Sequence, residues 1–190
     1  MLLLVRHGET SPNVDGLLLG RADPPLTARG QEQARALAAA LPRPDRVVSS
    51  PLTRAVATAG AFGVDIEVDE RWVELDYGEL EGRAPSAVPD ELWTRWRRDP
   101  AFAPPGGESL LAVGERVRAA CEALSGPAAS SVVVVVSHVS PIKAAMAWAL
   151  GTGDELAWRM FVEGASVSRI DVETSGPILR WFNRGLSSTA

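Results

Sequence analysis

The chain contains two histidines, and each of them closely follows a short apolar run. His7 comes two residues after the run at 2–5, and His138 comes two residues after the run at 132–136. Such runs are typical of buried parallel strands, and ligands of α/β sheets bind at the carboxyl ends of strands. A histidine side chain is largely neutral near pH 7 and can accept a phosphoryl group without activation by a metal. These two positions therefore predict a site for phosphoryl chemistry.

Arginines near the histidines fit the same chemistry by their position. The chain holds 18 arginines against one lysine, Lys143, which indicates a coding bias and is no argument for phosphate binding. Arg6 adjoins His7, and Arg54 lies near the start of a helix predicted to begin at residues 50–51. A guanidinium group donates paired hydrogen bonds to phosphate oxygens and stabilises the charge of a transferred phosphoryl group. Arg6 and Arg54 are therefore candidate phosphate ligands.

Strand and helix signals alternate along the chain. Apolar runs predict strands at residues 2–5, 47–48, 64–68, 131–136, 166–172 and 178–182. Capping residues followed by helix formers predict helices at residues 28–41, 50–60, 90–98, 110–124 and 141–150. This alternation predicts an α/β fold, a three-layer α/β/α sandwich with a mostly parallel central sheet. We expect a single domain over residues 1–190, with an insertion around 70–107 that sets specificity.

Composition and charge exclude several classes of protein. A net charge of −5 argues against attraction to nucleic acid or to an anionic membrane. The longest apolar run, 132–136, is far shorter than the roughly 20 residues that span a bilayer. The first residues lack the pattern of a signal peptide, so we expect a cytoplasmic protein. The single cysteine, Cys121, allows no internal disulfide and no Cys-rich metal site. We expect neither a metal nor a cofactor.

Six short motifs occur in a fixed order along the chain. They are LLVRHGET at 3–10 with Asn13, DPPLT at 23–27 with Gly30, SSPL at 49–52 with Arg54, Glu74 with Gly78, GGES at 106–109, and VSH at 136–138. Together they resemble the signatures of the histidine phosphatase superfamily, the phosphoglycerate mutase-like proteins. The resemblance covers residues 2 to about 146. It implies the phosphoglycerate mutase-like form of the predicted sandwich and a phosphohistidine mechanism.

The resemblance implies a role for each residue that matches a motif. His7 would be the nucleophile that carries the phosphoryl group. Arg6, Arg54 and His138 would bind the phosphate, with Asn13 as a further donor. The substrate would be a small phosphomonoester, hydrolysed without a metal.

Other candidate residues are less clearly assigned. Glu74 would donate a proton to the leaving oxygen and later activate water, with Glu81 as the alternative acid. Thr10, in the first motif, and Ser140, at the start of the helix after His138, are candidates for substrate binding. Many relatives carry glycine after the second histidine, whereas residues 139–143 here resemble a branch of acid phosphatases and alpha-ribazole phosphatases. We expect Lys143 to cap the outer edge of the site or to face solvent.

Several alternatives remain open at this stage. A phosphohistidine can pass its phosphoryl group to another hydroxyl, which would make the protein a phosphoglycerate mutase. A non-catalytic phospholigand-binding domain and a metal hydrolase are further alternatives, although no third metal ligand follows the spacing of known motifs. The cluster Trp93–Arg98 could stack on a nucleobase or pack the insertion onto the domain. Exposed edge strands near the C-terminus could support a homodimer.

Overall fold

The computed structural model describes residues 1–185 of the chain. The strands are β1 (Leu2–Arg6), β2 (Arg46–Ser49), β3 (Ile66–Val68), β4 (Val133–Ser137), β5 (Val167–Glu173) and β6 (Gly176–Arg184). The α-helices are α1 (Ser11–Val14), α2 (Ala28–Ala40), α3 (Thr53–Gly60), α4 (Asp90–Arg98), α5 (Leu110–Ser130) and α6 (Val139–Leu150). Short 3-10 helices are η1 (Glu70–Trp72), η2 (Gly78–Leu80), η3 (Pro85–Ala87) and η4 (Asp154–Arg159).

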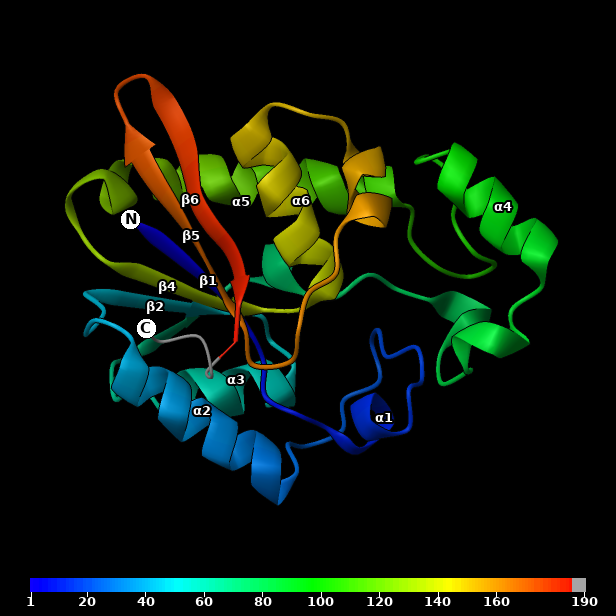
Figure 1. Cartoon of the computed structure of the whole chain (residues 1–190), viewed down its shortest axis with the longest axis horizontal. Coiled ribbons are helices and arrows are strands. Elements are labelled where there is room, and N and C mark those ends of the chain that lie inside the picture. Colours follow the sequence, from blue (N-terminus) through cyan, green and yellow to red (C-terminus); the bar gives the residue numbers. More distant parts are fainter. Residues whose placement is uncertain (186–190) are drawn as a thin grey trace.

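The six strands form one sheet in the order β3-β2-β4-β1-β5-β6. β3, β2, β4 and β1 run parallel to one another, whereas β5 and β6 are antiparallel at one edge. Helices α2 and α3 cover one face of this sheet, and α5 and α6 cover the other (Figure 1). The predicted three-layer α/β/α sandwich with a mostly parallel sheet is therefore confirmed.

The two faces of the sheet explain why its central strands are apolar throughout. Along β1, Leu2 and Leu4 pack into the core under α5 and α6, while Leu3 and Val5 pack into the core under α2 and α3. β4 shows the same alternation, and its four valines are fully buried. A strand covered on both faces has no solvated side, so its sequence is continuously hydrophobic. Packing on both faces therefore holds the carboxyl ends of these strands in fixed positions.

Two helices differ from the sequence prediction at their ends. α3 begins at Thr53 rather than at 50–51, because the Ser50 hydroxyl accepts a hydrogen bond from the Leu52 N–H (3.3 Å) in a bend before the helix. α5 continues to Ser130, although Pro127 was expected to lie beyond its end. Proline removes only its own N–H, and the Pro127 carbonyl still accepts a bond that closes the last turn.

Residues 70–107 lie beyond the carboxyl ends of the parallel strands, with α4 at the far right of Figure 1. They carry no strand of the sheet, yet Trp96 and Val88 are buried in the same core as the sheet. Trp93 and Trp96 stack on each other and contact Trp158 of η4. The structure therefore supports the packing interpretation of the Trp–Arg cluster.

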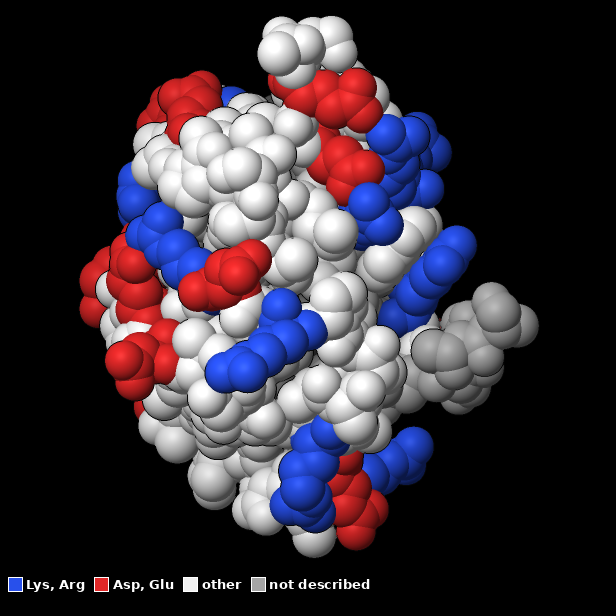
Figure 2. Space-filling model, turned by 90° about the vertical axis from the view of Figure 1, so that its left-hand side faces the viewer, with Lys and Arg blue, Asp and Glu red and all other residues white. Residues whose placement is uncertain are grey.

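The opposite face, where the strands begin, is mixed in charge. Figure 2 shows acidic and basic side chains interspersed over this face, which is the left side of Figure 1. Among residues 1–185, none of the helices combines the length and the apolar character that a membrane span needs.

Candidate active site

The two histidines lie side by side at the carboxyl edge of the sheet. β1 and β4 are neighbours in register, with Arg6 opposite Ser137, so His7 and His138 follow at the same level. Their ring centroids are 5.0 Å apart and the rings are tilted by 57°. His7 is 3% exposed and His138 is fully buried. The fold thus joins two residues that are far apart in the sequence.

The His7 ring is held in one tautomer. Its Nδ1 lies 2.7 Å from the Gly8 carbonyl oxygen, which can only accept, so Nδ1 carries the proton. Nε2 accepts a hydrogen bond from Arg54 Nε over 3.3 Å. Burial lowers the pKa of His7 well below its usual value of 6.5, and the charges of Arg6 and Arg54 lower it further. The ring is therefore neutral, with the lone pair of Nε2 directed into the site.

Two glycines allow the turn that carries His7 to pack against the start of α2. A Cβ on Gly8 would lie 2.3 Å from the Gly30 carbonyl oxygen, and a Cβ on Gly30 would lie 2.2 Å from that of Glu9. Neither approach leaves room for a side chain. The Gly8 N–H also donates to the Thr58 hydroxyl of α3 (3.1 Å). Contacts with both helices below the sheet therefore fix the backbone that orients His7.

Arg54 is the second residue of α3 and is completely buried. Its terminal nitrogens donate to the carbonyls of Gly20 (2.8 Å) and Ala22 (2.7 Å), which leaves Nε facing His7. The Glu81 carboxylate in turn accepts from the backbone N–H groups of Gly20 (2.8 Å) and Arg21 (3.0 Å). Glu81 thus holds the loop that holds Arg54.

Arg6 and His138 each present a buried polar atom without a partner among the described residues. Arg6 Nη1 donates to the Val162 carbonyl (2.7 Å), but its Nε is unpaired. His138 Nε2 contacts the Ser50 hydroxyl (2.7 Å), and its Nδ1 is unpaired. Burial lowers the pKa of His138 well below 6.5, as do His7 and Arg54 nearby. Because buried polar atoms are rarely left unpaired, these two mark a place where a ligand oxygen fits.

The Glu74 carboxylate lies at the start of α6. It accepts hydrogen bonds from the backbone N–H groups of Val139 (3.0 Å), Ser140 (3.1 Å) and Leu75 (2.8 Å). The positive end of a helix favours such an anion. Glu74 is 3% exposed, and its charge acts on both Arg6 and Arg54. We call His7, Arg6, Arg54, His138 and Glu74 together the histidine site.

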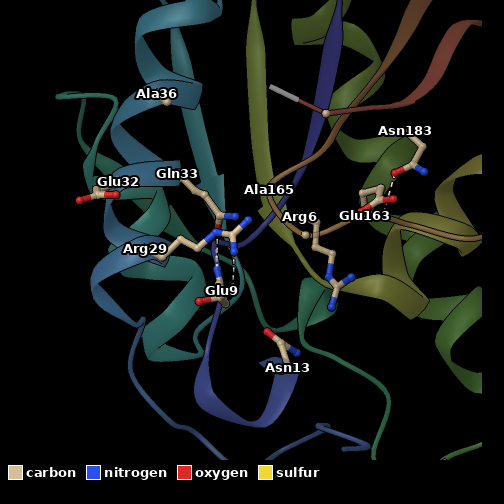
Figure 3. Close-up of a pocket in the computed structure, with 12 residues that line it drawn as sticks. Arg6, Glu9, Asn13, Arg29, Glu32, Gln33, Ala36, Glu163, Ala165 and Asn183 are labelled. Atoms are coloured by element: carbon tan, nitrogen blue, oxygen red, sulfur yellow. Dashed lines mark hydrogen bonds and ion pairs between the residues drawn. The ribbon is translucent and has the colours of Figure 1, made fainter. Parts of the chain in front are cut away.

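Asn13 lies at the rim of the histidine site. Its Oδ1 accepts from the N–H (3.2 Å) and the hydroxyl (2.8 Å) of Thr10, so the amide nitrogen is the polar atom of Asn13 that remains for a ligand. A cleft of about 910 Å³ runs past Asn13 and Arg6, between α2 on one side and Glu163 and Asn183 on the other (Figure 3). The cleft borders the histidine site at Arg6 and Asn13 rather than covering His7. The Thr10 hydroxyl is engaged in orienting Asn13.

The remaining sequence candidates lie on the other side of Glu74. The Ser140 backbone N–H bonds Glu74, and its side chain lines a small cavity together with Lys143 and Tyr77. Lys143 is partly buried, so it lies at the edge of the site rather than in solvent. Glu81, the alternative acid, is engaged with the loop around Gly20.

Sequence reasoning missed two residues that hold the histidine site together. Ser50 contacts His138, and it follows β2, the other parallel neighbour of β4. The rule that ligands bind at strand carboxyl ends could have found it. Arg116 of α5 donates to the carbonyls of Arg71 and Val73, both at 2.7 Å, just before Glu74. No spacing in the sequence indicates that contact.

Within the described part of the chain, no group of three or more His, Cys, Asp or Glu side chains is arranged to hold a metal ion. The positive charge near His7 comes instead from the guanidinium groups of Arg6 and Arg54.

Comparisons with known proteins agree with this geometry. The model of the histidine phosphatase superfamily, branch 1, matches residues 2–185. The chain belongs to the histidine phosphatase superfamily. It is 35% identical over 192 residues to phosphoserine phosphatase 1 of Hydrogenobacter thermophilus, which covers 96% of this chain and 91% of that protein. The predicted family is therefore confirmed.

Two further relatives refine the comparison. A bifunctional protein of Mycobacterium tuberculosis is 39% identical over 185 residues, which are 92% of this histidine phosphatase chain. The chain spans about half (51%) of the length of that mycobacterial relative. The structure of a mycobacterial glucosyl-3-phosphoglycerate phosphatase in complex with VO3 matches with a TM-score of 0.88 at 28% identity, covering 97% of this chain and 99% of that one.

Proposed function

We propose that this histidine phosphatase hydrolyses phosphomonoesters without a metal, through a covalent phosphohistidine at Nε2 of His7. The observation that carries the proposal is the His7 ring itself. Its proton is held on Nδ1 by the Gly8 carbonyl, its pKa is lowered by burial, and its Nε2 faces the guanidinium group of Arg54. A neutral imidazole whose Nε2 lone pair faces fixed positive charge suits attack on a phosphate ester.

In the first half-reaction, Nε2 of His7 attacks phosphorus and the bond from phosphorus to the ester oxygen breaks. Arg6 and Arg54 stabilise the charge on the phosphoryl oxygens, and the unpaired Nε of Arg6 supplies one of the donors. His138 Nδ1 supplies another in the tautomer whose Nε2 accepts from the Ser50 hydroxyl. Asn13 contributes its free amide at the rim. In this proposal the Glu74 carboxyl group gives a proton to the leaving oxygen.

In the second half-reaction, a water molecule replaces the alcohol. The Glu74 carboxylate takes a proton from this water, its oxygen attacks phosphorus, and the bond to Nε2 breaks. Inorganic phosphate leaves and His7 returns to its neutral form. The three backbone N–H groups around Glu74 keep the carboxylate in place for both steps.

We infer that the substrate is a small phosphorylated metabolite. The relatives are named for phosphoserine and for glucosyl-3-phosphoglycerate, and both compounds are small phosphomonoesters. We also propose that residues 70–107 set specificity within one domain, although the last five residues of the predicted domain lie outside the described ones. The cytoplasmic location and the homodimer stay predictions from the sequence.

The test measures p-nitrophenyl phosphate hydrolysis in the presence of a chelator, with mass spectrometry of acid-labile phosphorylation. Because the chain has two histidines, the variants His7→Gln and His138→Gln form a matched pair. We expect the wild type to turn over and label on His7. His138→Gln should label more slowly, and His7→Gln should neither turn over nor label. Label on His138 in the His7→Gln variant, or loss of wild-type activity in chelator, would contradict the mechanism. Transfer to an added phosphoglycerate rather than to water would favour the mutase.

A further inference from the structure

A second cavity lies next to Glu74, since two of its lining residues, Val139 and Ser140, donate hydrogen bonds to the Glu74 carboxylate. It has a volume of about 70 Å³ and combines residues from the segment after Glu74 with residues of α4, α5, α6 and η4. Its lining residues are Leu75, Tyr77, Trp93, Trp96, Leu110, Val139, Ser140, Lys143, Ala157 and Trp158. We call it the aromatic cavity. Val139 and Ser140 belong both to its wall and to the hydrogen bonds of Glu74, so the cavity adjoins the proposed acid.

The aromatic wall of this cavity is a packed unit. Trp93 and Trp96 stack with centroids 5.6 Å apart, and Trp158 meets both rings edge-on at 6.0 and 5.7 Å. Tyr77 meets Trp96 edge-on at 5.9 Å. The indole N–H groups of Trp96 and Trp158 are buried and have no acceptor among the described residues. The wall therefore contains two indole N–H donors that have no hydrogen-bond acceptor among the described residues, which is rare for buried polar groups.

Lys143, the only lysine of the chain, brings an ammonium group to the same cavity. Burial lowers the pKa of Lys143, the nearby charge of Glu74 opposes this, and Arg6 adds to it. The ammonium group makes no ion pair with any residue in the described range. The nearby Glu74 carboxylate is already engaged by three backbone N–H groups, so a partly buried ammonium group with no ion pair of its own is costly unless a ligand supplies negative charge. Lys143 therefore favours an anion in the aromatic cavity.

The size of the cavity limits what that anion is. One water molecule occupies about 30 Å³ in the liquid, so the cavity corresponds to about two waters. A carboxylate group fits such a space, whereas the ring system of a nucleobase does not. Trp96 is also too buried, at 1% exposure, to stack on a base.

We propose that the aromatic cavity is a subsite for a carboxylate on the leaving group, with Lys143 as the residue that selects it. The proposal rests on the proposed function, since the leaving oxygen must lie at Glu74. The substrate would be a phosphomonoester whose alcohol carries a carboxylate a few bonds from the ester oxygen. Its phosphate would lie at His7, and its carboxylate would reach past Glu74 toward Lys143.

The test compares substrates that differ only in the carboxylate. 3-Phosphoglycerate is paired with glycerol 3-phosphate, and phosphoserine with phosphoethanolamine. For the wild type we expect kcat/KM to be at least tenfold higher for the carboxylated member of at least one pair. In Lys143→Met this ratio should fall at least tenfold, and Lys143→Arg should restore part of it. The control Arg98→Gln removes an exposed charge of α4 outside the cavity and should change the ratio less than twofold.

Two outcomes overturn the proposal. One is a wild type that shows no preference in either pair, and the other is a Lys143→Met variant that loses activity on both members equally. A binding measurement separates this from failure of the mechanism. Calorimetry of the His7→Gln variant, which needs no turnover, should show tighter binding of 3-phosphoglycerate than of glycerol 3-phosphate. That preference should disappear in the double variant His7→Gln with Lys143→Met. Equal binding of both ligands by His7→Gln would refute the subsite even if hydrolysis occurs.

Discussion

The histidine site and the aromatic cavity are neighbours, but they are built in different ways. The histidine site stands at the ends of adjacent parallel strands, and its residues are tied to backbone groups of the turn after β1, the loop around Gly20 and the start of α6. The aromatic cavity contains no strand residue and is assembled from five separate segments that pack through aromatic rings. The catalytic geometry we propose thus depends on the central sheet. The groups we assign to specificity lie instead in the segments that pack around α4 and η4, which we call the aromatic layer.

The two regions also differ in charge. The histidine site places two guanidinium groups beside two neutral imidazoles, which suits a phosphate with its double negative charge. The aromatic cavity holds a single ammonium group. Glu74 belongs to the histidine site, but its carboxylate accepts hydrogen bonds from backbone N–H groups of Val139 and Ser140, which line the aromatic cavity. Substitutions on either side of Glu74 should therefore have different effects.

The largest effect is expected for Glu74→Gln, measured on two substrates that differ in their leaving group. Glutamine keeps the shape but has no proton to give, so kcat for an alkyl phosphate such as glycerol 3-phosphate should fall by about 10²–10⁴-fold. The kcat for p-nitrophenyl phosphate should fall much less, because nitrophenolate leaves without protonation.

Glu81→Gln is the matched control for this experiment. Glu81 supports Arg54 through the Gly20 loop, and its hydrogen bonds among residues 1–185 go to Gly20 and Arg21 rather than to α6. The substitution should therefore lower kcat for both substrates by a similar factor. If Glu81→Gln rather than Glu74→Gln shows the dependence on the leaving group, the acid has been assigned to the wrong carboxylate.

A second prediction concerns stability below neutral pH. The pKa values of His7 and His138 are lowered well below 6.5 in the folded protein, whereas the unfolded chain has ordinary histidines. The unfolded state therefore binds up to two more protons, and stability falls as pH drops below about 6.5. Between pH 6 and pH 5 these two groups should lower the free energy of unfolding, by an amount on the order of 1 kcal/mol for each.

Urea unfolding at several pH values measures how steeply the free energy of unfolding depends on pH, and we call this dependence the pH slope. His138→Gln should retain about half of it, because one of the two titrating groups is gone. An unchanged slope in this variant would mean that other groups dominate. Nitrogen-detected NMR of the two histidine rings provides a direct check, with His7 protonated at Nδ1 and no titration near pH 6.5. A ring that titrates normally would show that the histidine site is open to solvent.

Much of this arrangement could be predicted from the sequence, because the relevant signals are local. Continuous apolar runs mark strands covered on both faces, and the residues that follow them fall at one edge of the sheet. These two signals predict that His7 and His138 lie at the carboxyl edge of the sheet, as the structure shows. The N-cap Thr27, whose hydroxyl accepts from the Gly30 N–H (3.0 Å), likewise fixed the start of α2.

The contacts that complete the site could not be predicted, because they join segments distant in the chain. Arg54 is held by carbonyl groups of an irregular loop, and Arg116 holds the backbone before Glu74. Backbone carbonyls leave no signature in the sequence. Lys143 illustrates the same limit. Helix periodicity does not reveal that η4 and α4 close a cavity around it.

The smallest expected effect concerns the aromatic layer. Trp93 Nε1 donates to the Pro85 carbonyl (3.1 Å) and so ties α4 to η3. Trp93→Phe keeps a ring but removes this bond, which should cost about 0.5–1.4 kcal/mol locally. Amide exchange over residues 85–98 should then accelerate about two- to tenfold, while β1 and β4 remain protected. Trp181→Phe, on β6, is the matched control and should leave residues 85–98 unaffected. If Trp93→Phe also accelerated exchange in β1 and β4, the two regions would form one cooperative unit rather than a rigid site with a separate aromatic layer.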